Sequence, residues 1–230
     1  MNKGIQKIFS GIPQTYEFLN HFFTWGLDIL LRKRAAKIAS ADGGNLWIDV
    51  CSGTGEMAVC LRQNAAKDTI VIGADFCLPM LKKAVEKDES RGIFFTIMDS
   101  YFLPFRNETF DLVTISFASR NINVTPENFS QCLREFHRIL KQGGRFVNLE
   151  TSQPSVWIIK KLFHFYVESV IKLIGAVVSG SPPAYAYLAN TIPRFYNTDE
   201  LAEIIHKAGF SKVTFDRMFF GVAAIHKAIK

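Results

Sequence analysis

From about residue 44 onward, the chain alternates short apolar runs with amphipathic helical patterns. The apolar runs predict strands at Leu46–Cys51, Thr69–Asp75, Ile93–Met98, Leu112–Phe117, Arg145–Glu150, Lys212–Met218 and Val222–His226. The helical patterns cover Glu56–Asn64, Pro79–Glu89, Glu127–Lys141 and Thr198–Ala208. Gly143-Gly144 is expected to end the third of these helices. Strands that alternate with helices predict an α/β fold, with a parallel sheet that helices cover on both faces.

No internal repeat or low-complexity linker interrupts this order, so residues 1–230 are expected to form a single domain. Residues 1–40 and 152–197 lie outside the alternating pattern. They are expected to be helical additions, an N-terminal cap and a lid insertion.

Composition narrows the class of protein. With 48% hydrophobic residues and 21 Phe, the chain has enough apolar surface for a core, which argues against disorder. Its four Cys show no close pairing, so neither a metal site nor a disulfide framework is expected, and a reduced compartment fits best. The most apolar stretch, Val156–Val178, contains four charged residues, and the N-terminus has no unbroken apolar core. We therefore expect no membrane span, no signal peptide and a cytoplasmic location.

The net charge of +6 is concentrated in the two additions. Residues 1–40 carry six Lys or Arg against two acidic residues, and residues 152–197 carry four against one. A nucleic-acid partner is not expected, because the basic residues form no dense stripe interleaved with stacking aromatics. Basic charge on apolar segments suits the anionic inner face of a cell membrane, where the protein would sit peripherally. A solvated basic face kept for solubility is an equally open alternative.

The segment Asp49-Val-Cys-Ser-Gly53-Thr54-Gly55 follows the first predicted strand. Glycines there let the backbone turn tightly and approach a ligand at the carboxyl edge of the sheet. Asp75 ends the second strand, where a carboxylate can accept hydrogen bonds from both hydroxyls of a ribose. Together these features predict a site for a cofactor that contains a ribose.

The same glycines also match the dinucleotide fingerprint, and charge separates the two interpretations. A pyrophosphate would lie between the carboxylates of Asp49 and Glu56, which would repel it. S-adenosylmethionine (SAM) carries a sulfonium and an ammonium, which acidic neighbours stabilise. We therefore favour SAM over NAD, although either carboxylate could instead be a solvated loop residue.

The ends of the third and fourth strands complete the predicted site. Asp99 and Ser100 are placed to reach the adenine, with Asp99 accepting from its amino group; a helix-capping role for Asp99 is the alternative. Ser116 and Phe117 would line the methionine side of the pocket, unless Phe117 belongs to the core.

Longer motifs resemble the C-methyltransferases of ubiquinone and menaquinone biosynthesis (UbiE/MenG type). The resemblance runs from about Phe9 to His226 and is carried by FSGIPQTYEFLN, DVCSGTGEMA, GADFCLPMLKKA, LPFRNETFDLVTISFASRN, REFHRILKQGGRFVNLETSQP, VSGSPPAYAYLANTIPRF, LAEIIHKAGF and GVAAIHK. It implies a Rossmann-like class I methyltransferase fold, with a mostly parallel seven-stranded sheet and an antiparallel C-terminal strand. It also implies that Thr54, Asp75, Asp99, Ser100 and Ser116 hold SAM, and that the acceptor is demethylmenaquinol or a related benzoquinol.

Four positions depart from the family pattern. Glu17 stands where Asp is usual, Ser169 and Lys172 replace a His and a Pro, and Tyr196 replaces a Pro. These changes leave the cofactor motifs intact, so they bear on the ring and tail of the acceptor.

Methylation of a ring carbon requires the neighbouring hydroxyl to lose its proton, because the phenolate pushes electron density into the ring. Arg120 follows the fourth strand and is expected to stabilise that phenolate, since its pKa is too high for a base. Asn121 would orient a water molecule or the quinol oxygen. A structural Arg120 paired with a carboxylate is the alternative. Tyr16, Tyr185 and Tyr187 could touch the ring, whereas His164 and His226 are interpreted as core residues.

The two additions are rich in aromatic residues that could line a groove for a prenyl tail: Phe18, Phe22, Phe23, Trp25, Trp157, Phe163, Phe165 and Tyr166. Packing between the additions, or a homodimer interface, would explain them equally well. Two further functions stay open, a methyltransferase of another phenolic or lipid acceptor and a SAM-binding module without catalysis.

Overall fold

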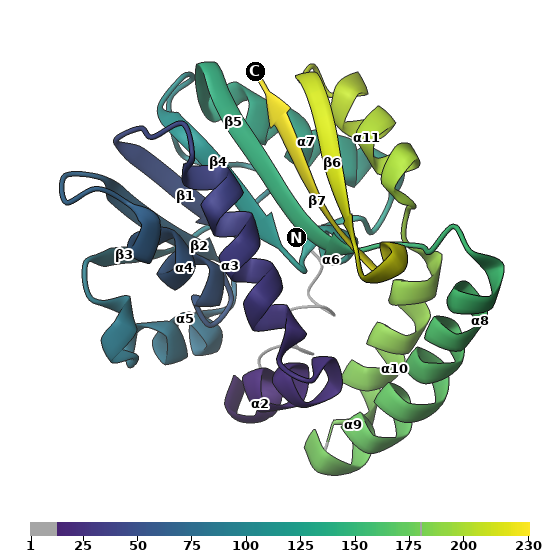
Figure 1. The fold of residues 1–230 in the computed structure, drawn as a ribbon. Coiled ribbons are helices and arrows are strands. Elements are labelled where there is room, and N and C mark those ends of the chain that lie inside the picture. Colours follow the sequence, from purple (N-terminus) through teal and green to yellow (C-terminus); the bar gives the residue numbers. More distant parts are fainter. Residues whose placement is uncertain (1–12, 180) are drawn as a thin grey trace.

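The structure is a computed structural model that describes residues 13–179 and 181–230, apart from the side chains of residues 13–16, 178 and 179. One sheet of seven strands has the order β3-β2-β1-β4-β5-β7-β6 (Figure 1). The strands are β1 (Leu46–Val50), β2 (Ile70–Asp75), β3 (Ile93–Ile97), β4 (Phe110–Ser116), β5 (Leu140–Thr151), β6 (Ser211–Met218) and β7 (Ala223–Ile229). Strands β1 to β5 pair in parallel, and β7 is antiparallel to both β5 and β6. This topology confirms the predicted fold class.

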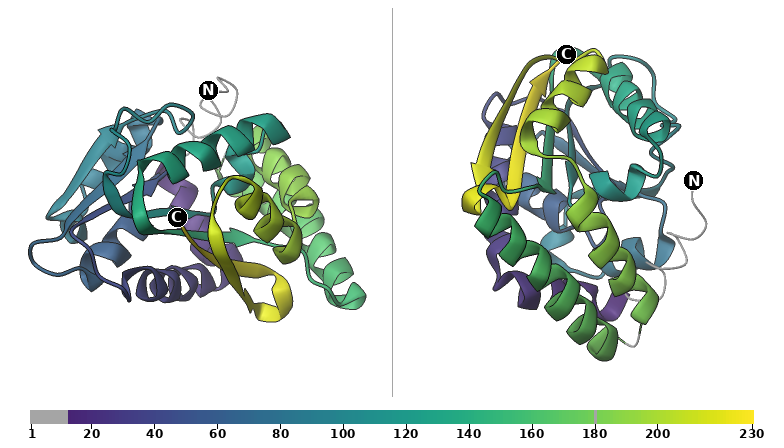
Figure 2. Two further views of the ribbon diagram at one scale, coloured as in Figure 1. Left: turned by 90° about the horizontal axis from the view of Figure 1, so that it is seen from above. Right: turned by 90° about the vertical axis from the view of Figure 1, so that its right-hand side faces the viewer.

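Helices surround the sheet and extend beyond one end of it (Figure 2). Those connecting or flanking the strands are α3 (Leu27–Ser40), α4 (Glu56–Asn64), α5 (Leu78–Val85), α6 (Ser119–Ile122), α7 (Pro126–Ile139) and α11 (Thr198–Lys207). The others are α2 (Pro13–Thr24), α8 (Trp157–Phe165), the π-helical segment η2 (Tyr166–Ile171), α9 (Lys172–Ser179) and α10 (Pro182–Thr191). Short 3-10 segments lie at Asp88–Ser90, Ile192–Arg194 and Phe219–Gly221. None of the helices in the described ranges is long and apolar enough to span a membrane.

Two of the helices begin with sequence features that fix their first turns. The side chain of Thr125 accepts a hydrogen bond from the amide of Asn128, and Pro126 occupies the first turn of α7. At α11, Asn197 and Glu200 form a reciprocal capping box. These local signals explain why both helices were predicted close to their observed starts.

Alternating strand residues build the two cores that flank the sheet. Ile48 and Val113 pack in a cluster with residues of α7 and α11, whereas Trp47 and Leu112 pack in a cluster with residues of α3 and α4. Burying each such aliphatic side chain contributes about 1.5–3 kcal/mol. Successive strand residues therefore hold helices to opposite faces of the sheet, as their period of two requires.

A third core joins the helices beyond the sheet. Leu19 and Phe23 of α2 pack with Val167 of η2 and Tyr185 of α10. A Cβ added at Gly175 would lie 2.0 Å from Cδ1 of Tyr185, so this glycine is what lets α9 and α10 approach so closely. Helix α2 and the segment 163–192, distant in sequence, thus share one apolar core below the sheet in Figure 1.

The end of α7 differs from the prediction, which was wrong to place Gly143-Gly144 at the helix terminus. The helix ends at Ile139, and Leu140 already has extended backbone and pairs with β4. Both glycines lie inside β5, where Gly143 has a φ of +75° and the pairing register shifts before Arg145. Gly143 N and Gly144 O hydrogen-bond the backbone of Lys230, at 3.1 and 2.9 Å. The glycines therefore accommodate an irregular strand rather than a helix cap.

Candidate active site

The loop after β1 brings backbone close to its neighbours at the carboxyl edge of the sheet. Gly53 and Gly55 have φ values of +57° and +83°, which residues with a side chain rarely adopt. A Cβ added at Gly55 would also lie 3.0 Å from Cβ of Ala84 and 3.0 Å from the ring of Phe95. Neighbouring residues of α5 and β3 therefore exclude a side chain at Gly55, whereas the predicted approach of this loop to a ligand stays a prediction.

Asp75 is tied to this loop by its carboxylate. Its Oδ2 accepts from the amide of Gly53 and its Oδ1 from the amide of Cys77, both at 2.8 Å. Burial raises the pKa of Asp75, while the hydrogen bonds from Cys77 and Gly53 act in the opposite direction. The carboxyl group also lines a cavity, so it is held rigidly where a ligand can meet its remaining lone pairs.

The cavity lies at the carboxyl ends of β1, β2 and β4. Seven residues predicted for the site line it: Gly53, Thr54, Asp75, Ser100, Ser116, Phe117 and Asn121. Cys51, Ser52, Glu56, Phe76 and Met80 are among its other lining residues. The chain therefore brings most of the residues selected from separate strand ends to one place.

Asp49, Gly55 and Asp99 lie near this cavity without lining it. Asp49 is fully buried, and its Oδ1 accepts from the hydroxyl of Thr114 at 2.8 Å. Burial raises the pKa of Asp49 to about 7, a shift that hydrogen bonding and the charge of Arg32 oppose. The carboxylate of Asp99 accepts from the amide of Tyr101 at 3.1 Å in an Asx turn, and the described residues between Asp99 and β4 contain no helix for it to cap.

The hydrogen-bond acceptors of this cavity suit a ligand that carries cations and hydroxyls. Glu56 and Asp75 present carboxyl groups to the cavity, and Asp49 lies behind its wall. The Oδ1 atom of Asn121, another lining residue, is buried and has no hydrogen-bond partner among the described residues. Two carboxyl groups and this amide oxygen fit the ammonium, sulfonium and ribose hydroxyls of SAM better than a pyrophosphate, even with the Arg32 guanidinium in the wall.

Arg120 is placed differently from the residues of this cavity. Its Nη1 lies 2.6 Å from Oε1 of Glu150, and both side chains are buried. Its Nε is also buried and finds no hydrogen-bond partner within the described part of the chain. Arg120 is therefore paired with a carboxylate, the arrangement that sequence reasoning held as the alternative, yet keeps one donor uncommitted.

Arg120 lines a second cavity, which is mostly apolar and has a volume of about 290 Å³. Its walls come from the cap, the lid and the β6–β7 connection, and include Phe23, Trp25, Leu31, Phe163, Tyr166, Val167, Tyr185, Leu188, Ile192 and Phe219. Four of the eight aromatic residues expected in a tail groove are among them. The other four (Phe18, Phe22, Trp157 and Phe165) are more than half exposed.

The two cavities share Arg32 and Phe117 as lining residues. Phe117 has a φ of +52° at the end of β4, and its amide donates to the carbonyl of Leu149 at 2.7 Å. The guanidinium of Arg32 lies 5.1 Å from the centroid of the Phe117 ring. This pair marks the place where a ligand in one cavity would meet a ligand in the other.

Sequence reasoning missed Arg32 and its partners. Arg32 contacts Asp28 and Glu56, at 2.6 and 3.1 Å, and His21 contacts the same two carboxylates. The one available signal was Asp28 four residues before Arg32, the spacing of an ion pair along one face of a helix. Glu56 was noted only as an acidic neighbour of the loop.

The tyrosines and histidines considered for the acceptor site differ in where the structure places them. Tyr185 lines the apolar cavity, Tyr187 does not, and the side chain of Tyr16 is outside the described residues. Nε2 of His164 lies 2.7 Å from the amide oxygen of Gln153. His226 is buried, with Nε2 2.9 Å from the carbonyl of Thr198.

Comparison with known proteins agrees with this geometry. Residues 1–230 match the model of the ubiE/COQ5 methyltransferase family. A demethylmenaquinone methyltransferase of Lactiplantibacillus plantarum is 36% identical over 98% of this chain and 95% of its own length. A demethylmenaquinone methyltransferase of Thermus thermophilus is 36% identical over 95% of this chain and 98% of its own length. A ubiquinone/menaquinone biosynthesis C-methyltransferase UbiE of Desulfotalea psychrophila is 31% identical over 99% and 90%.

Solved structures share the fold at lower sequence identity. A SAM-dependent methyltransferase of Thermotoga maritima superposes with a TM-score of 0.65 at 19% identity, over 98% of this chain and 99% of that one. Human N-acetylserotonin methyltransferase, solved with SAM, has a TM-score of 0.64 at 15% identity, and the match covers 93% of this chain and 55% of the human one. The match over the full length, the relatives above 30% identity and the cavity at the strand ends lead to one assignment: the chain belongs to the ubiE/COQ5 methyltransferase family and is a SAM-dependent methyltransferase.

Proposed function

We propose that this enzyme transfers the methyl group of SAM to a ring carbon of a prenylated quinol, either demethylmenaquinol or a related benzoquinol. The observation that carries the proposal is the apolar cavity that adjoins the cofactor cavity at Arg32 and Phe117. The names of the relatives support the same substrate class. In this proposal residues 1–230 act as one domain, with the cap (1–40) and the lid (152–197) enclosing the acceptor.

In the cofactor cavity, Asp75 accepts from the ribose hydroxyls while the turn at Gly53, Thr54 and Gly55 passes beside the ligand. Asp99 and Ser100 serve the adenine end, and Ser116 and Asp49 the methionine end. Bound SAM supplies an electrophilic methyl group on a sulfonium. The residues of the chain need only hold the acceptor carbon in line behind that methyl, a positioning effect worth several kcal/mol.

Arg120 is the proposed electrostatic partner of the acceptor. Glu150 holds its guanidinium through the 2.6 Å contact, so the side chain is fixed before the acceptor binds. The buried Nε–H can then donate to the oxygen of the phenolate as it forms. Asn121, which lines the adjoining cofactor cavity, would use its Oδ1 to orient the acceptor oxygen or a water beside it.

The cavity walls fit a hydrocarbon tail. Leu31, Val167, Leu188 and Ile192 offer apolar surface to its interior. Transfer of a methylene from water into such a site is worth about 0.8 kcal/mol. A prenyl tail would therefore contribute to binding without any polar contact.

The same cavity opens where apolar side chains face solvent. Trp25 is 88% exposed and Phe220 80%, and the outer surface of the lid exposes Val156, Trp157, Ile158, Leu162, Phe165 and Leu173. Lys160 and Lys161 lie exposed among them, with the Lys161 ammonium 4.1 Å from the centroid of the Trp157 ring. We propose that this face rests on an anionic membrane surface and draws the acceptor from it, with a second copy of the chain as the competing occupant.

Product analysis tests the proposal. Purified enzyme, isotopically labelled SAM and reduced demethylmenaquinone with a short prenyl tail should yield a product whose label lies on a ring carbon, as magnetic resonance shows. A matched benzoquinol determines which ring is preferred. A label on oxygen, or no turnover with either ring, would contradict it.

A further inference from the structure

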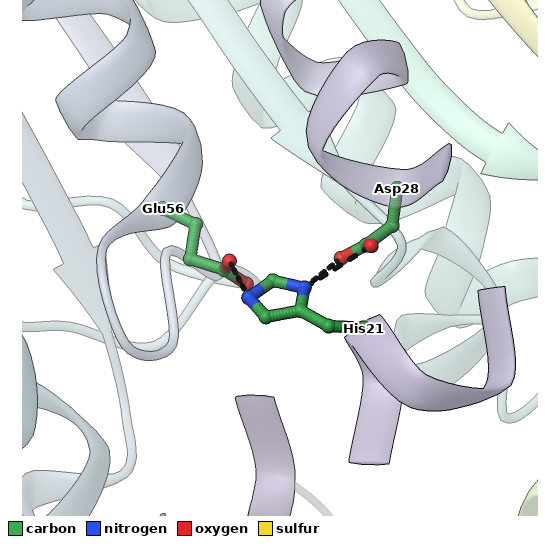
Figure 3. A group of neighbouring side chains, drawn as sticks. All are labelled: His21, Asp28 and Glu56. Carbon is green, nitrogen blue, oxygen red and sulfur yellow. Dashed lines mark hydrogen bonds and ion pairs between the residues drawn. The ribbon is translucent and has the colours of Figure 1, made fainter. Parts of the chain in front are cut away.

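Four ionisable side chains meet where the cap touches the cofactor loop. Nδ1 of His21 lies 2.9 Å from Oδ2 of Asp28, and Nε2 lies 3.2 Å from Oε1 of Glu56 (Figure 3). Arg32 joins the same carboxylates, with Nη1 2.6 Å from Asp28 and Nη2 3.1 Å from Glu56. We call these four residues the junction cluster, because they come from α2, α3 and α4 and lie between the two cavities.

The geometry of His21 requires an additional proton in this cluster. A neutral imidazole has one N–H, so it can donate to only one of the two carboxylates that face its nitrogens. At the other nitrogen, a lone pair would face a carboxylate at hydrogen-bond distance. That contact is favourable only if a further proton resides on the ring or on Glu56.

Several charges act on this proton. Burial raises the pKa of Glu56, opposed by the charge of Arg32, while Glu17 raises it further and His21 lowers it. Glu17 is itself paired with Lys87, which also donates to the carbonyl of Thr54 at 2.8 Å. At Asp28 the hydrogen bond from Thr24 and the charge of Arg32 outweigh burial and lower the pKa. The additional proton therefore lies between His21 and Glu56 rather than on Asp28.

A metal ion is a weaker interpretation of the same cluster. Ligand atoms of His21, Asp28 and Glu56 lie within 4.8 Å of one another, a spacing that a metal could use. The guanidinium of Arg32 already contacts both carboxylates, and a second permanent cation would be repelled by it.

The cluster faces both ligands. Glu56 and Arg32 line the cofactor cavity, and Asp28, Arg32 and Thr24 line the apolar cavity. The His21 side chain is 32% exposed, which gives a proton an exit to solvent. A cation that enters the cofactor cavity therefore acts directly on the proton at Glu56, and a hydroxyl in the second cavity can reach the cluster through Thr24 and Asp28.

We propose that the junction cluster is the proton acceptor of the methyl transfer. The cluster releases its own proton when the sulfonium of SAM enters the cofactor cavity, and it can then take up the proton of the acceptor. The acceptor half of this inference rests on the proposed function. As the acceptor's O–H bond breaks, its proton passes through Thr24 and Asp28 to the His21–Glu56 contact. The ring carbon forms the new C–C bond as the S–C pair returns to sulfur. The ring hydrogen then leaves as a proton while the acceptor oxygen takes one up, which restores the aromatic quinol. Because the sulfonium charge has then vanished, the cluster again holds its proton.

Proton release on cofactor binding tests the inference without any acceptor. Calorimetry in two buffers of different ionisation enthalpy gives the number of protons exchanged when SAM or S-adenosylhomocysteine binds. The two ligands share the same amino acid moiety, so their difference isolates the sulfonium. We expect SAM to release several tenths of a proton, up to about one, more than S-adenosylhomocysteine does. Equal proton release by both ligands would overturn the inference.

Variants locate the source of the proton. His21→Gln and Glu56→Gln should each remove the difference between the two ligands, whereas His206→Gln, an exposed histidine on α11, should preserve it. A difference that persists in both cluster variants, or that disappears when a chelator is added, would overturn the assignment. Failure of SAM to bind would instead contradict the proposed function. Binding without differential release would contradict only this inference.

A single turnover tests whether the cluster takes up the proton of the acceptor. With SAM already bound and a pH indicator dye present, the wild-type enzyme should methylate the quinol without net release of a proton to the medium, because the cluster keeps it, whereas His21→Gln should release one proton together with methylation. Release of a full proton by the SAM-loaded wild type during methylation would contradict proton uptake by the cluster.

Discussion

The two cavities are built in different ways. The walls of the cofactor cavity come from residues at strand ends, and Asp75 is fixed there by backbone amides at 2.8 Å. The walls of the apolar cavity come from helices of two segments more than a hundred residues apart, held by side-chain packing around Tyr185. The first depends on hydrogen bonds within a sheet and the second on how helices dock. Substitutions are therefore expected to change the acceptor more readily than the cofactor.

The departures from the family pattern, which were expected to bear on the acceptor, do not line its cavity. Glu17 pairs with Lys87 beside the cofactor loop, and Tyr196 stacks on Phe129 at a centroid distance of 6.1 Å. Ser169 is half-buried and Lys172 exposed, and neither lines the apolar cavity. All four lie in or against the additions and connections rather than among the residues that line either cavity.

The largest effect is expected at Arg120. Arg120→Ala should lower the methyl-transfer rate by about 10²–10³, the usual consequence of removing one electrostatic partner of a developing oxyanion. SAM affinity, measured by calorimetry, should stay near that of the wild type because Arg120 lines only the apolar cavity.

A matched control separates this effect from instability. Arg120→Ala leaves the buried carboxylate of Glu150 without its partner, which costs about 3–5 kcal/mol. The double variant Arg120→Met, Glu150→Gln removes the stranded charge, so its thermal midpoint should recover while its rate stays low. Recovery of the rate as well would show that Arg120 is a structural residue.

The next effect concerns the cofactor cavity alone. Asp75→Ala should weaken SAM binding by about 1.5–3 kcal/mol, or roughly 10- to 100-fold, because a charge-assisted hydrogen bond is lost. Asp75→Asn, which keeps one acceptor for the amide of Gly53, should show a smaller loss. Unchanged affinity in both variants would remove Asp75 from the cofactor site.

The smallest effect concerns the outer face of the lid. Each exposed Lys near an anionic bilayer contributes about 1 kcal/mol, and added salt screens that attraction. Lys160→Glu, Lys161→Glu should therefore weaken sedimentation with anionic vesicles about tenfold or more, with neutral vesicles as the control. Binding that ignores salt and vesicle charge would disprove the membrane face, and a concentration-dependent dimer through the lid would identify a second copy as its occupant.

The strands, and the cavity residues at their ends, could be predicted because period-two burial and glycine turns are local properties. Arg120 was found for the same reason, but its partner Glu150 was not, since their contact depends on the register that places Ser116 beside Leu149. The junction cluster was missed because it forms only when α2 and α3 dock against α4. The end of α7 was predicted wrongly from Gly143-Gly144, because a glycine pair indicates a turn but not which element contains it.

The contribution of the tail to catalysis tests the two-cavity interpretation most directly. The measurement is kcat/KM for a prenylated demethylnaphthoquinol against its tail-less analogue, in detergent at saturating SAM. Burial of even one prenyl unit should raise kcat/KM at least tenfold, at about 0.8 kcal/mol per methylene. The Leu188→Trp variant, which fills the apolar cavity, should reduce that advantage and leave the tail-less substrate unaffected. Equal kcat/KM for both substrates would contradict a tail site between the cap and the lid.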